Sequence, residues 1–219
     1  MQKESKRKRI QRTKVVFEKL LLEFPDAHCA LNYKNPLELL IATILSAQCT
    51  DKNVNRVTRE LFQKYQTAKD YADSDLEELS QDIRSIGLYR AKAKNIRLTC
   101  QALVNQHGGQ VPASMEALVA LFGVGRKTAN VVLGTIFGIN EGVVVDTHVG
   151  RIVRLLGLTS EESPVKIEQD LLVLVPKPDR TKFSHLLIEH GRKTCIANRP
   201  KCFACAVADY CNYNLKQKK

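Results

Sequence analysis

The sequence predicts an all-α protein with two helical domains. Apolar residues recur at spacings of three and four along almost the whole chain, which is the period of an amphipathic helix. Helix-capping residues precede most of these segments, and glycines separate several of them. The exception is Val143-Val144-Val145, which fits a short strand but is too short to indicate a sheet.

The composition indicates a folded globular protein. Of the 219 residues, 44% are hydrophobic and 26% are charged, a balance that disordered chains do not have. No apolar run approaches the roughly 18 residues that span a bilayer. Met1 is followed by charged residues and not by an apolar signal segment. The sequence therefore excludes the membrane and secreted classes.

Capping residues predict the helices of the first half in order. The expected boundaries are Asn35-Pro36 before a helix to about residue 45, Asp51 as the next cap, a capping box over Ser74–Glu77, and Gly108-Gly109 after a long helix over 90–106.

The second half predicts further helices and an irregular end. The expected segments are a short helix from Ser114 to Leu121, a glycine turn, a helix from Arg126 to about Phe137, a helix opened by Asp146, two helices over 164–174 and 180–191, and an irregular cysteine segment.

Positive charge is concentrated at the two ends and in stretches without acids. Residues 1–14 hold seven Lys or Arg against one Glu, and the tail adds three lysines. These ends predict either solvated arms or a nonspecific DNA-binding arm. Residues 83–115, 117–140 and 190–208 contain no acid but several cations. This distribution favours a basic face for nucleic acid over a merely solvated one.

Gly123, Val124, Gly125 and Arg126 form a tight turn between two predicted helices. Glycine permits positive φ and leaves its N–H group uncovered. Together with the donors at the next helix's N-terminus, these groups could hold a phosphate. An ordinary helix–helix corner is the alternative, and the basic stretches favour the phosphate site.

Lys127 and Asp146 are the candidate catalytic residues. Lys127 follows Arg126 in the first turn of its helix, where the helix dipole and the guanidinium both disfavour an ammonium, as a nucleophilic amine requires. The alternative is a cation that contacts phosphate and keeps its proton. Asp146 heads a helix, so it is expected to cap that helix. A remaining carboxylate oxygen could also stabilise a sugar cation or move a proton.

Four cysteines near the end are the most specific pattern in the chain. They are Cys195, Cys202, Cys205 and Cys211, separated by six, two and five residues. Such a cluster indicates metal ligation in a reducing compartment. Zinc sites usually pair two close C-x2-C arms, and only the middle pair is close here, which favours an iron–sulfur cluster over zinc or two disulfides. Arg199 and Lys201 would be presented to a nucleic-acid backbone.

These motifs together resemble the endonuclease III family, the iron–sulfur branch of the helix–hairpin–helix DNA glycosylases. The resemblance covers about residues 15–213. Its motifs are Leu121–Lys127, Val145-Asp146-Thr147-His148, the four-cysteine spacing, Ser46–Asp51 and Ile86-Gly87-Leu88-Tyr89. The family commonly has Pro where this chain has Phe122.

The resemblance implies two helical domains that flank a DNA-binding cleft. Residues 29–139 would form a six-helix domain with the helix–hairpin–helix. Residues 1–28, a basic arm and a helix, would pack with residues 140–219, which would carry a [4Fe–4S] cluster on the four cysteines.

The resemblance also implies roles for single residues. Lys127 matches the family's nucleophile and Asp146 its catalytic carboxylate. Gln48 matches the residue that fills the gap left by an extruded base, and Leu88 matches a wedge on the opposite strand.

The implied function is base-excision DNA repair. The enzyme would remove oxidised pyrimidines and cleave the abasic site by β-elimination through a Lys127 Schiff base. Its partner would be double-stranded DNA with damaged pyrimidines or abasic sites, met by a monomer in the cytoplasm at the nucleoid. The alternatives are a monofunctional mismatch glycosylase, against which Lys127 argues, and a non-catalytic redox-sensing DNA-binding protein.

Overall fold

The computed structural model describes residues 4–217, and these residues form only helices, turns and loops. The all-α prediction is therefore confirmed. Residues 143–145 are a buried loop and not a strand, and the backbone N–H of Val144 donates to Ser184 Oγ at 3.0 Å. Among the described helices, none has both the length and the apolar character required to cross a membrane.

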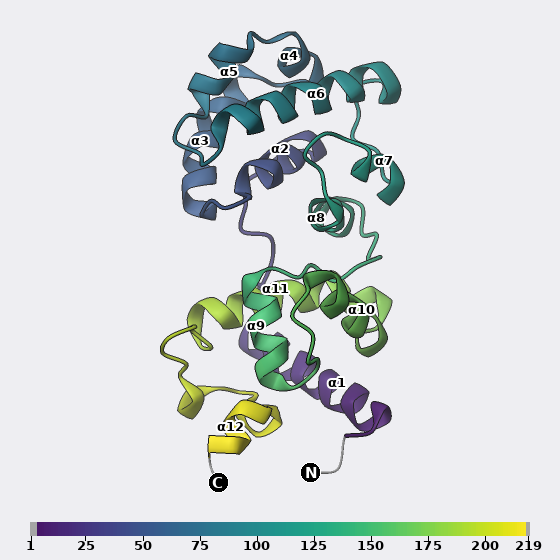
Figure 1. Ribbon diagram of the computed structural model, residues 1–219, viewed down its shortest axis with the longest axis vertical. Helices are drawn as coiled ribbons and strands as arrows, with labels where there is room; N and C mark the ends of the chain where they lie inside the picture. Colours follow the sequence, from purple (N-terminus) through teal and green to yellow (C-terminus); the bar gives the residue numbers. More distant parts are fainter. Residues whose placement is uncertain (1–3, 218–219) are drawn as a thin grey trace. The chain divides into compact units, whose positions relative to one another are not determined.

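The chain divides into two compact units, and the helices of each are labelled in Figure 1. The hairpin unit, Ala30–Ile139, contains α2 (Pro36–Ser46), α3 (Asp51–Lys64), α4 (Ala68–Asp73), α5 (Leu76–Asp82), α6 (Tyr89–His107), α7 (Met115–Val119) and α8 (Arg126–Ile136). The cysteine unit combines the chain up to Cys29 with the chain from Asn140. Its elements are α1 (Lys6–Glu23), α9 (Thr147–Leu156), α10 (Pro164–Leu174), η1 (Lys177–Asp179), α11 (Arg180–Lys193), η2 (Cys202–Ala204), η3 (Ala208–Tyr210) and α12 (Asn212–Gln217).

Helix α2 is the centre of the hairpin unit. Its residues 39–45 are all buried, so the helix is covered on every side. Helices α3, α6 and α8 pack around it (Figure 1). Asn35 caps α2 as predicted, since its Oδ1 accepts from the Glu38 N–H at 2.9 Å. The loops at the ends of α2 and α6 are therefore fixed by a rigid core.

The cysteine unit has a core of its own. Helix α9 buries Val149, Ile152, Val153 and Leu156 at spacings of three, one and three, and this stripe packs against α11. Helix α1 also packs on α11, where the rings of Phe17 and Phe183 lie 6.3 Å apart. The helix at the start of the chain is thus part of the unit that contains the cysteines.

Two predicted caps were displaced by one residue. Thr50, not Asp51, caps α3 and accepts from Asn53 N–H. Asp75, not Ser74, caps α5, because the Asp75 carboxylate accepts from Glu78 N–H at 2.9 Å. In both places two adjacent residues can serve as caps, and the sequence does not say which backbone turns into the helix first.

The basic N-terminal segment is largely helical and not a free arm. Helix α1 begins at Lys6 with Ser5 as its cap. Arg9 donates to the Leu158 carbonyl at 3.2 Å, so this part of the basic segment contacts the cysteine unit. Lys3, Lys218 and Lys219 lie outside the described residues.

Candidate functional site

The predicted glycine turn joins α7 to α8. The Val124 N–H donates to the Leu121 carbonyl at 3.2 Å, and Gly123 between them has φ +71°. This is a β-turn whose third position needs a positive φ, which glycine adopts without strain. Gly125 then precedes α8 without a side-chain cap. The first N–H groups of α8 therefore have no partner from a capping side chain.

Helix α6 packs against this turn and holds its backbone. The Thr99 hydroxyl donates to the Phe122 carbonyl at 2.6 Å. A Cβ on Gly123 would lie 2.8 Å from Asn95 Nδ2, so the turn and α6 approach too closely for another residue. The backbone of the turn is therefore held by α6 as well as by its own hydrogen bond.

Lys127 is exposed in the first turn of α8, next to the exposed Arg126. Within the described residues, the Lys127 amine makes no hydrogen bond or ion pair. An amine without a fixed partner at the positive end of a helix is accessible to an electrophile or an anion.

Gln48 and Leu88 share an unusual backbone conformation. They are the two non-glycine residues with positive φ among those described, at +55° and +59°. Both are exposed, Leu88 to 65%. Their loops adjoin, because a Cβ on Gly87 would lie 3.7 Å from the Gln48 carbonyl oxygen. Such strained positions persist where the surrounding structure fixes them, and they cluster at functional sites.

Asp146 belongs to the cysteine unit and caps α9 as predicted. Its Oδ1 accepts from Val149 N–H at 2.8 Å. The residue is half-buried after the buried residues 143–145. The cap fixes the direction of the carboxylate, and within the described residues no other hydrogen bond involves its oxygens.

All four cysteines of the cluster line one cavity. Their thiols are free, and the cavity is otherwise lined largely by α9 and the C-terminal turns, including Ile152, Leu156 and Val207. No three His, Cys, Asp or Glu side chains in the described part of the chain converge closely enough to hold a metal ion. Four thiols around a shared apolar cavity fit a group wider than a single ion.

The cavity's sulfurs have polar neighbours from two helices. Arg151 Nη1 lies 3.6 Å from Cys195 Sγ, and His190 Nε2 lies 3.6 Å from Cys205 Sγ. Burial raises the pKa of the Cys205 thiol to about 11 and also raises that of Cys195. A group bound by these thiolates must therefore displace their protons.

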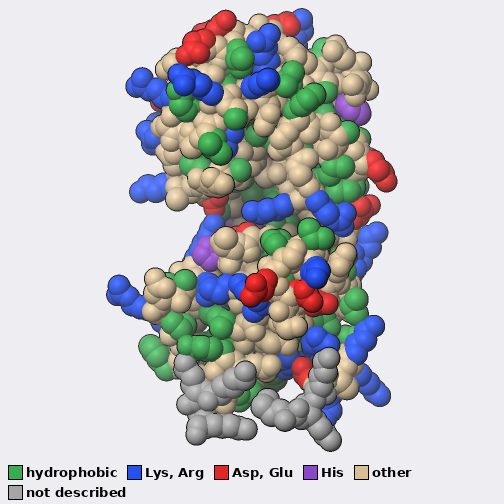
Figure 2. Space-filling model, in the orientation of Figure 1, with side chains coloured by type: hydrophobic (Ala, Val, Ile, Leu, Met, Phe, Trp, Pro, Cys, Tyr) green, Lys and Arg blue, Asp and Glu red, His purple; other side chains and the backbone are tan. Residues whose placement is uncertain are grey.

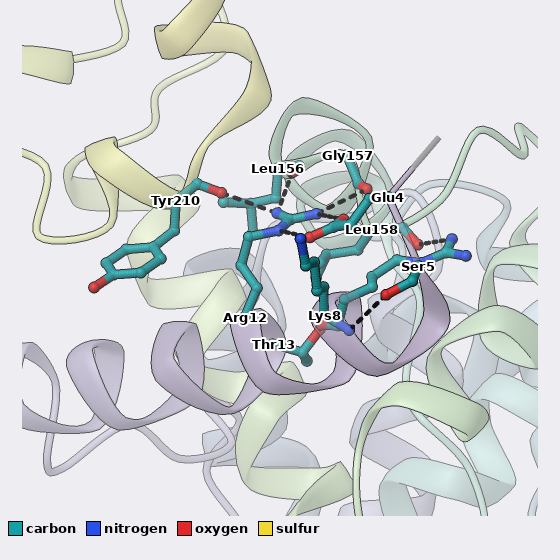
Figure 3. Close-up of polar contacts among 10 residues, drawn as sticks. Glu4, Ser5, Lys8, Arg12, Thr13, Leu156, Gly157, Leu158 and Tyr210 are labelled. Carbon is teal, nitrogen blue, oxygen red and sulfur yellow. Dashed lines mark hydrogen bonds and ion pairs between the residues drawn. The ribbon is translucent and has the colours of Figure 1, made fainter. Parts of the chain in front are cut away.

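Arg12 connects α1 to the cysteine segment (Figure 3). Its guanidinium donates to the carbonyls of Leu156 at 2.6 Å, Gly157 at 3.2 Å and Tyr210 at 2.9 Å. It also pairs with Glu4 at 2.7 Å. One side chain thereby fixes the end of α9 and the residue before Cys211. The sequence placed Arg12 in a basic arm and gave no signal of this role.

Arg199 and Lys201 are exposed on the loop between the first two cysteines of the cluster. The Lys201 N–H donates to the Thr194 carbonyl at 2.9 Å, which anchors the end of this loop. On the face that Figure 2 presents, Lys and Arg side chains lie on both units with acidic side chains among them. The single basic face stays a prediction.

Lys92 does not belong to that basic surface. The sequence counted it as one of the cations of residues 83–115, but the residue is only 5% exposed. Its Nζ donates to the carbonyls of Leu45 at 2.9 Å and Ala47 at 2.5 Å. The partners are nearly fifty residues away in the sequence, so no local pattern could have identified them.

Comparisons with known proteins agree on one family. Residues 41–177 match the HhH-GPD superfamily of base excision DNA repair proteins. Endonuclease III of Synechocystis is 48% identical over 94% of this chain and 93% of its own. Endonuclease III of Bacillus subtilis is 48% identical over 90% of each chain. A structure of endonuclease III trapped as a covalent intermediate on DNA superposes with a TM-score of 0.90 at 44% identity, covering 96% of this chain and 99% of that one.

Proposed function

Because the chain belongs to the endonuclease III family of the HhH-GPD superfamily, we propose that Lys127 and Asp146 perform its chemistry on DNA. The protein is a base-excision repair enzyme, a DNA glycosylase and abasic-site lyase. The observation that carries the assignment is the exposed Lys127 amine in the first turn of α8, a helix that follows the glycine turn and has no side-chain cap.

The hairpin binds the phosphate backbone. The N–H groups at the start of α8, which no capping side chain binds, attract an anion together with the helix dipole. Arg126 adds positive charge there, while Arg199 and Lys201 do so in the cysteine unit. Backbone contacts position the protein without reading sequence, which suits an enzyme that must find damage anywhere.

Gln48 and Leu88 open the duplex. The substrate is an oxidised pyrimidine, whose weakened stacking lowers the free energy needed to extrude it. Gln48 fills the gap and Leu88 enters the opposite strand. Their strained and exposed backbone supports this assignment, because a wedge must be presented rigidly to a stacked helix.

Lys127 is the nucleophile. Its neutral amine forms a bond to C1′ of the extruded nucleotide, and the bond from C1′ to the base breaks with its electron pair on the base, which takes up a proton. Asp146 stabilises the positive charge that develops on the sugar. Opening of the sugar ring gives a Schiff base between Lys127 and C1′.

The Schiff base makes strand cleavage possible. It acidifies the C2′ proton, and removal of that proton expels the 3′ phosphate by β-elimination. Water then hydrolyses the imine, which releases the amine of Lys127 and an unsaturated aldehyde. One residue thus serves both the glycosylase and the lyase steps.

The four cysteines hold a [4Fe–4S] cluster. Cys195, Cys202, Cys205 and Cys211 line one cavity with free thiols, as its ligands must. The bound cluster supplies a rigid cross-link and no step of the reaction. The loop with Arg199 and Lys201 is fixed at both ends by ligands, so its cations face the DNA backbone as a preformed surface.

The partner is double-stranded DNA with damaged pyrimidines or abasic sites. The enzyme acts on it as a monomer, in the cytoplasm at the nucleoid. The positive charge of the chain supports this assignment, since the formal net charge is +11.

Borohydride trapping tests the nucleophile. The parent enzyme and an exposed-lysine control, Lys69→Ala, should both become covalently linked to an abasic duplex. Lys127→Ala should lose trapping by on the order of a thousandfold or more, with its binding to an uncleavable abasic analogue largely retained. Unchanged trapping by Lys127→Ala would identify another amine as the nucleophile.

A further inference from the structure

One helix, α6, meets all three DNA-facing elements of the hairpin unit. Leu88 precedes its first residue, and Lys92, Asn95 and Thr99 follow at spacings of four, three and four. Residues with this spacing lie on one face of a helix. Lys92 contacts the loop before Gln48, and the other two contact the hairpin.

Lys92 completes the C-terminal end of α2. That helix has no basic residue in its last turn, and its C-cap Ala47, with φ −58°, is not the left-handed residue that commonly ends a helix. The last carbonyls of a helix have no partners within it. The Lys92 ammonium serves two carbonyls at this end, those of Leu45 and Ala47, and its charge matches the negative end of the helix dipole.

The Lys92 ammonium binds the peptide group that precedes Gln48. Ala47, whose carbonyl Lys92 binds, is the residue before Gln48, and Gln48 has φ +55°. A non-glycine residue in this left-handed region carries backbone strain. It keeps the conformation only where the surrounding structure fixes it. On the other side, the Cys49 N–H donates to the Ser46 carbonyl at 3.1 Å. Gln48 is therefore held between two fixed peptide groups.

Asn53 joins the same loop to the Leu88 loop. Its Nδ2 lies 3.0 Å from the Ser85 carbonyl and 3.3 Å from Cys49 Sγ. Lys92 and Asn53 thus hold the Gln48 and Leu88 loops from α6 and α3 respectively. Burial lowers the pKa of Lys92, so this cation is kept at an electrostatic cost that an apolar side chain would not incur.

We propose that Lys92 is a positioning residue for base extrusion: by binding the carbonyls of Leu45 and Ala47, it holds Gln48 in the conformation that fills the gap in the duplex. The inference rests on the proposed role of Gln48. It assigns Lys92 no contact with DNA and no part in the chemistry of Lys127.

The test compares two substrates in Lys92→Met, with Lys69→Met as the control, because Lys69 is exposed and lies outside the predicted basic stretches. A duplex with an oxidised pyrimidine requires extrusion, whereas a single-stranded abasic oligonucleotide does not. Lys92→Met should remove the base from the duplex roughly 10- to 100-fold more slowly, as expected for a misplaced group, while trapping on the single strand changes by less than about twofold. Lys69→Met should keep both rates within about twofold. An equal loss on both substrates would overturn the proposal.

A double-mutant cycle with Gln48→Ala separates positioning from general destabilisation. If Lys92 acts through Gln48, adding Lys92→Met to Gln48→Ala should cost less than about twofold more on the duplex. Fully multiplicative losses would refute the proposal. Should Lys92→Met fail to fold, Lys92→Gln keeps one donor and enters the same cycle. Loss of single-strand trapping in the parent would instead contradict the nucleophile, so the two failures are distinguishable.

Discussion

The hairpin unit holds its candidate site residues at the ends of helices around a buried centre, whereas the cysteine unit carries most of its four clustered cysteines at short turns. Gln48 follows the end of α2, Leu88 precedes α6, and Lys127 lies in the first turn of α8, all helices that pack in the hairpin core. Cys202 begins one three-residue 3₁₀ turn, Cys205 directly follows that turn, and Cys211 directly follows a second one. The first arrangement is complete from protein contacts alone, and the second depends on what the four sulfurs bind.

Removing one sulfur should therefore affect only one unit. In Cys205→Ser, we expect the absorbance of an iron–sulfur cluster near the visible edge to be lost and the cysteine segment to be destabilised by several kcal/mol, because cluster binding is part of its folding free energy. Hydrogen exchange should rise over residues 195–211 and stay low in α2. Cys29→Ser, outside the cavity, is the control. A cluster retained at full occupancy in Cys205→Ser would contradict the ligand assignment.

Arg12 links α1 to the cysteine segment through protein contacts alone. Arg12→Met breaks the bonds to Leu156, Gly157 and Tyr210 and leaves Glu4 without its partner. We expect a loss of roughly 2–3 kcal/mol in the free energy of unfolding and faster release of iron to a chelator, because charged hydrogen bonds to partly buried carbonyls are lost. Urea unfolding and loss of absorbance measure these effects.

The control for Arg12 lies two residues further along the same helix. Lys14→Met removes the same charge from an exposed site with a weak pair to Glu18, at 3.9 Å. It should change the free energy of unfolding by less than about 0.5 kcal/mol. Equal effects of Arg12→Met and Lys14→Met would show that positive charge in general, and not the hydrogen bonds of Arg12, stabilises the cysteine segment.

Acid should also distinguish the two units. Burial, with His28, Lys182 and Arg192 adding and Glu189 opposing, lowers the pKa of His185 in α11 to about 4. In the hairpin unit, burial raises the pKa of Tyr65 and Cys100 to about 12, so these groups stay neutral in acid.

The direction of this pH dependence follows from the pKa of His185 in the unfolded chain. Unfolded His185 takes up a proton near pH 6.5 while the folded residue stays neutral, so the free energy of unfolding is unaffected above about pH 6.5 and falls as pH decreases towards 4, by about 3 kcal/mol. His185→Gln should flatten the dependence of the urea midpoint on pH in this window. His107→Gln, in the hairpin unit, should leave it unchanged. An unaltered slope in His185→Gln would place the acid sensitivity elsewhere.

The sequence predicted the presence of the helices better than the residues at which they begin and end. Apolar spacing identifies a helix such as α9 because burial of one face stabilises it, but the six-residue α4 is too short for a periodic pattern and was missed. The caps at Asp51 and Ser74 were wrong by one residue for the same local reason.

The residues of the candidate site likewise divide into those that the sequence identifies and those that it does not. Gly123 and the four cysteines are visible because their residue types are rare and their spacing is fixed by chemistry. Lys92 and Arg12 are not, because a lysine or arginine in a basic stretch has the same sequence signal whether it is solvated or buried against distant carbonyls. Positioning by long-range contacts is thus the part that only the fold reveals.

The smallest effect concerns the hairpin turn itself. Phe122 is the second residue of a turn whose third residue, Gly123, has positive φ, and proline is favoured at that second position. The Thr99 hydroxyl already fixes the Phe122 carbonyl, and no backbone hydrogen bond is donated by the Phe122 N–H within the described residues. Phe122→Pro should therefore stabilise the protein by at most about 1 kcal/mol, by restricting the unfolded chain, and change trapping by less than about twofold. Phe122→Ala controls for loss of the ring, and a marked fall in trapping with proline alone would mean that the turn must flex to accept the phosphate.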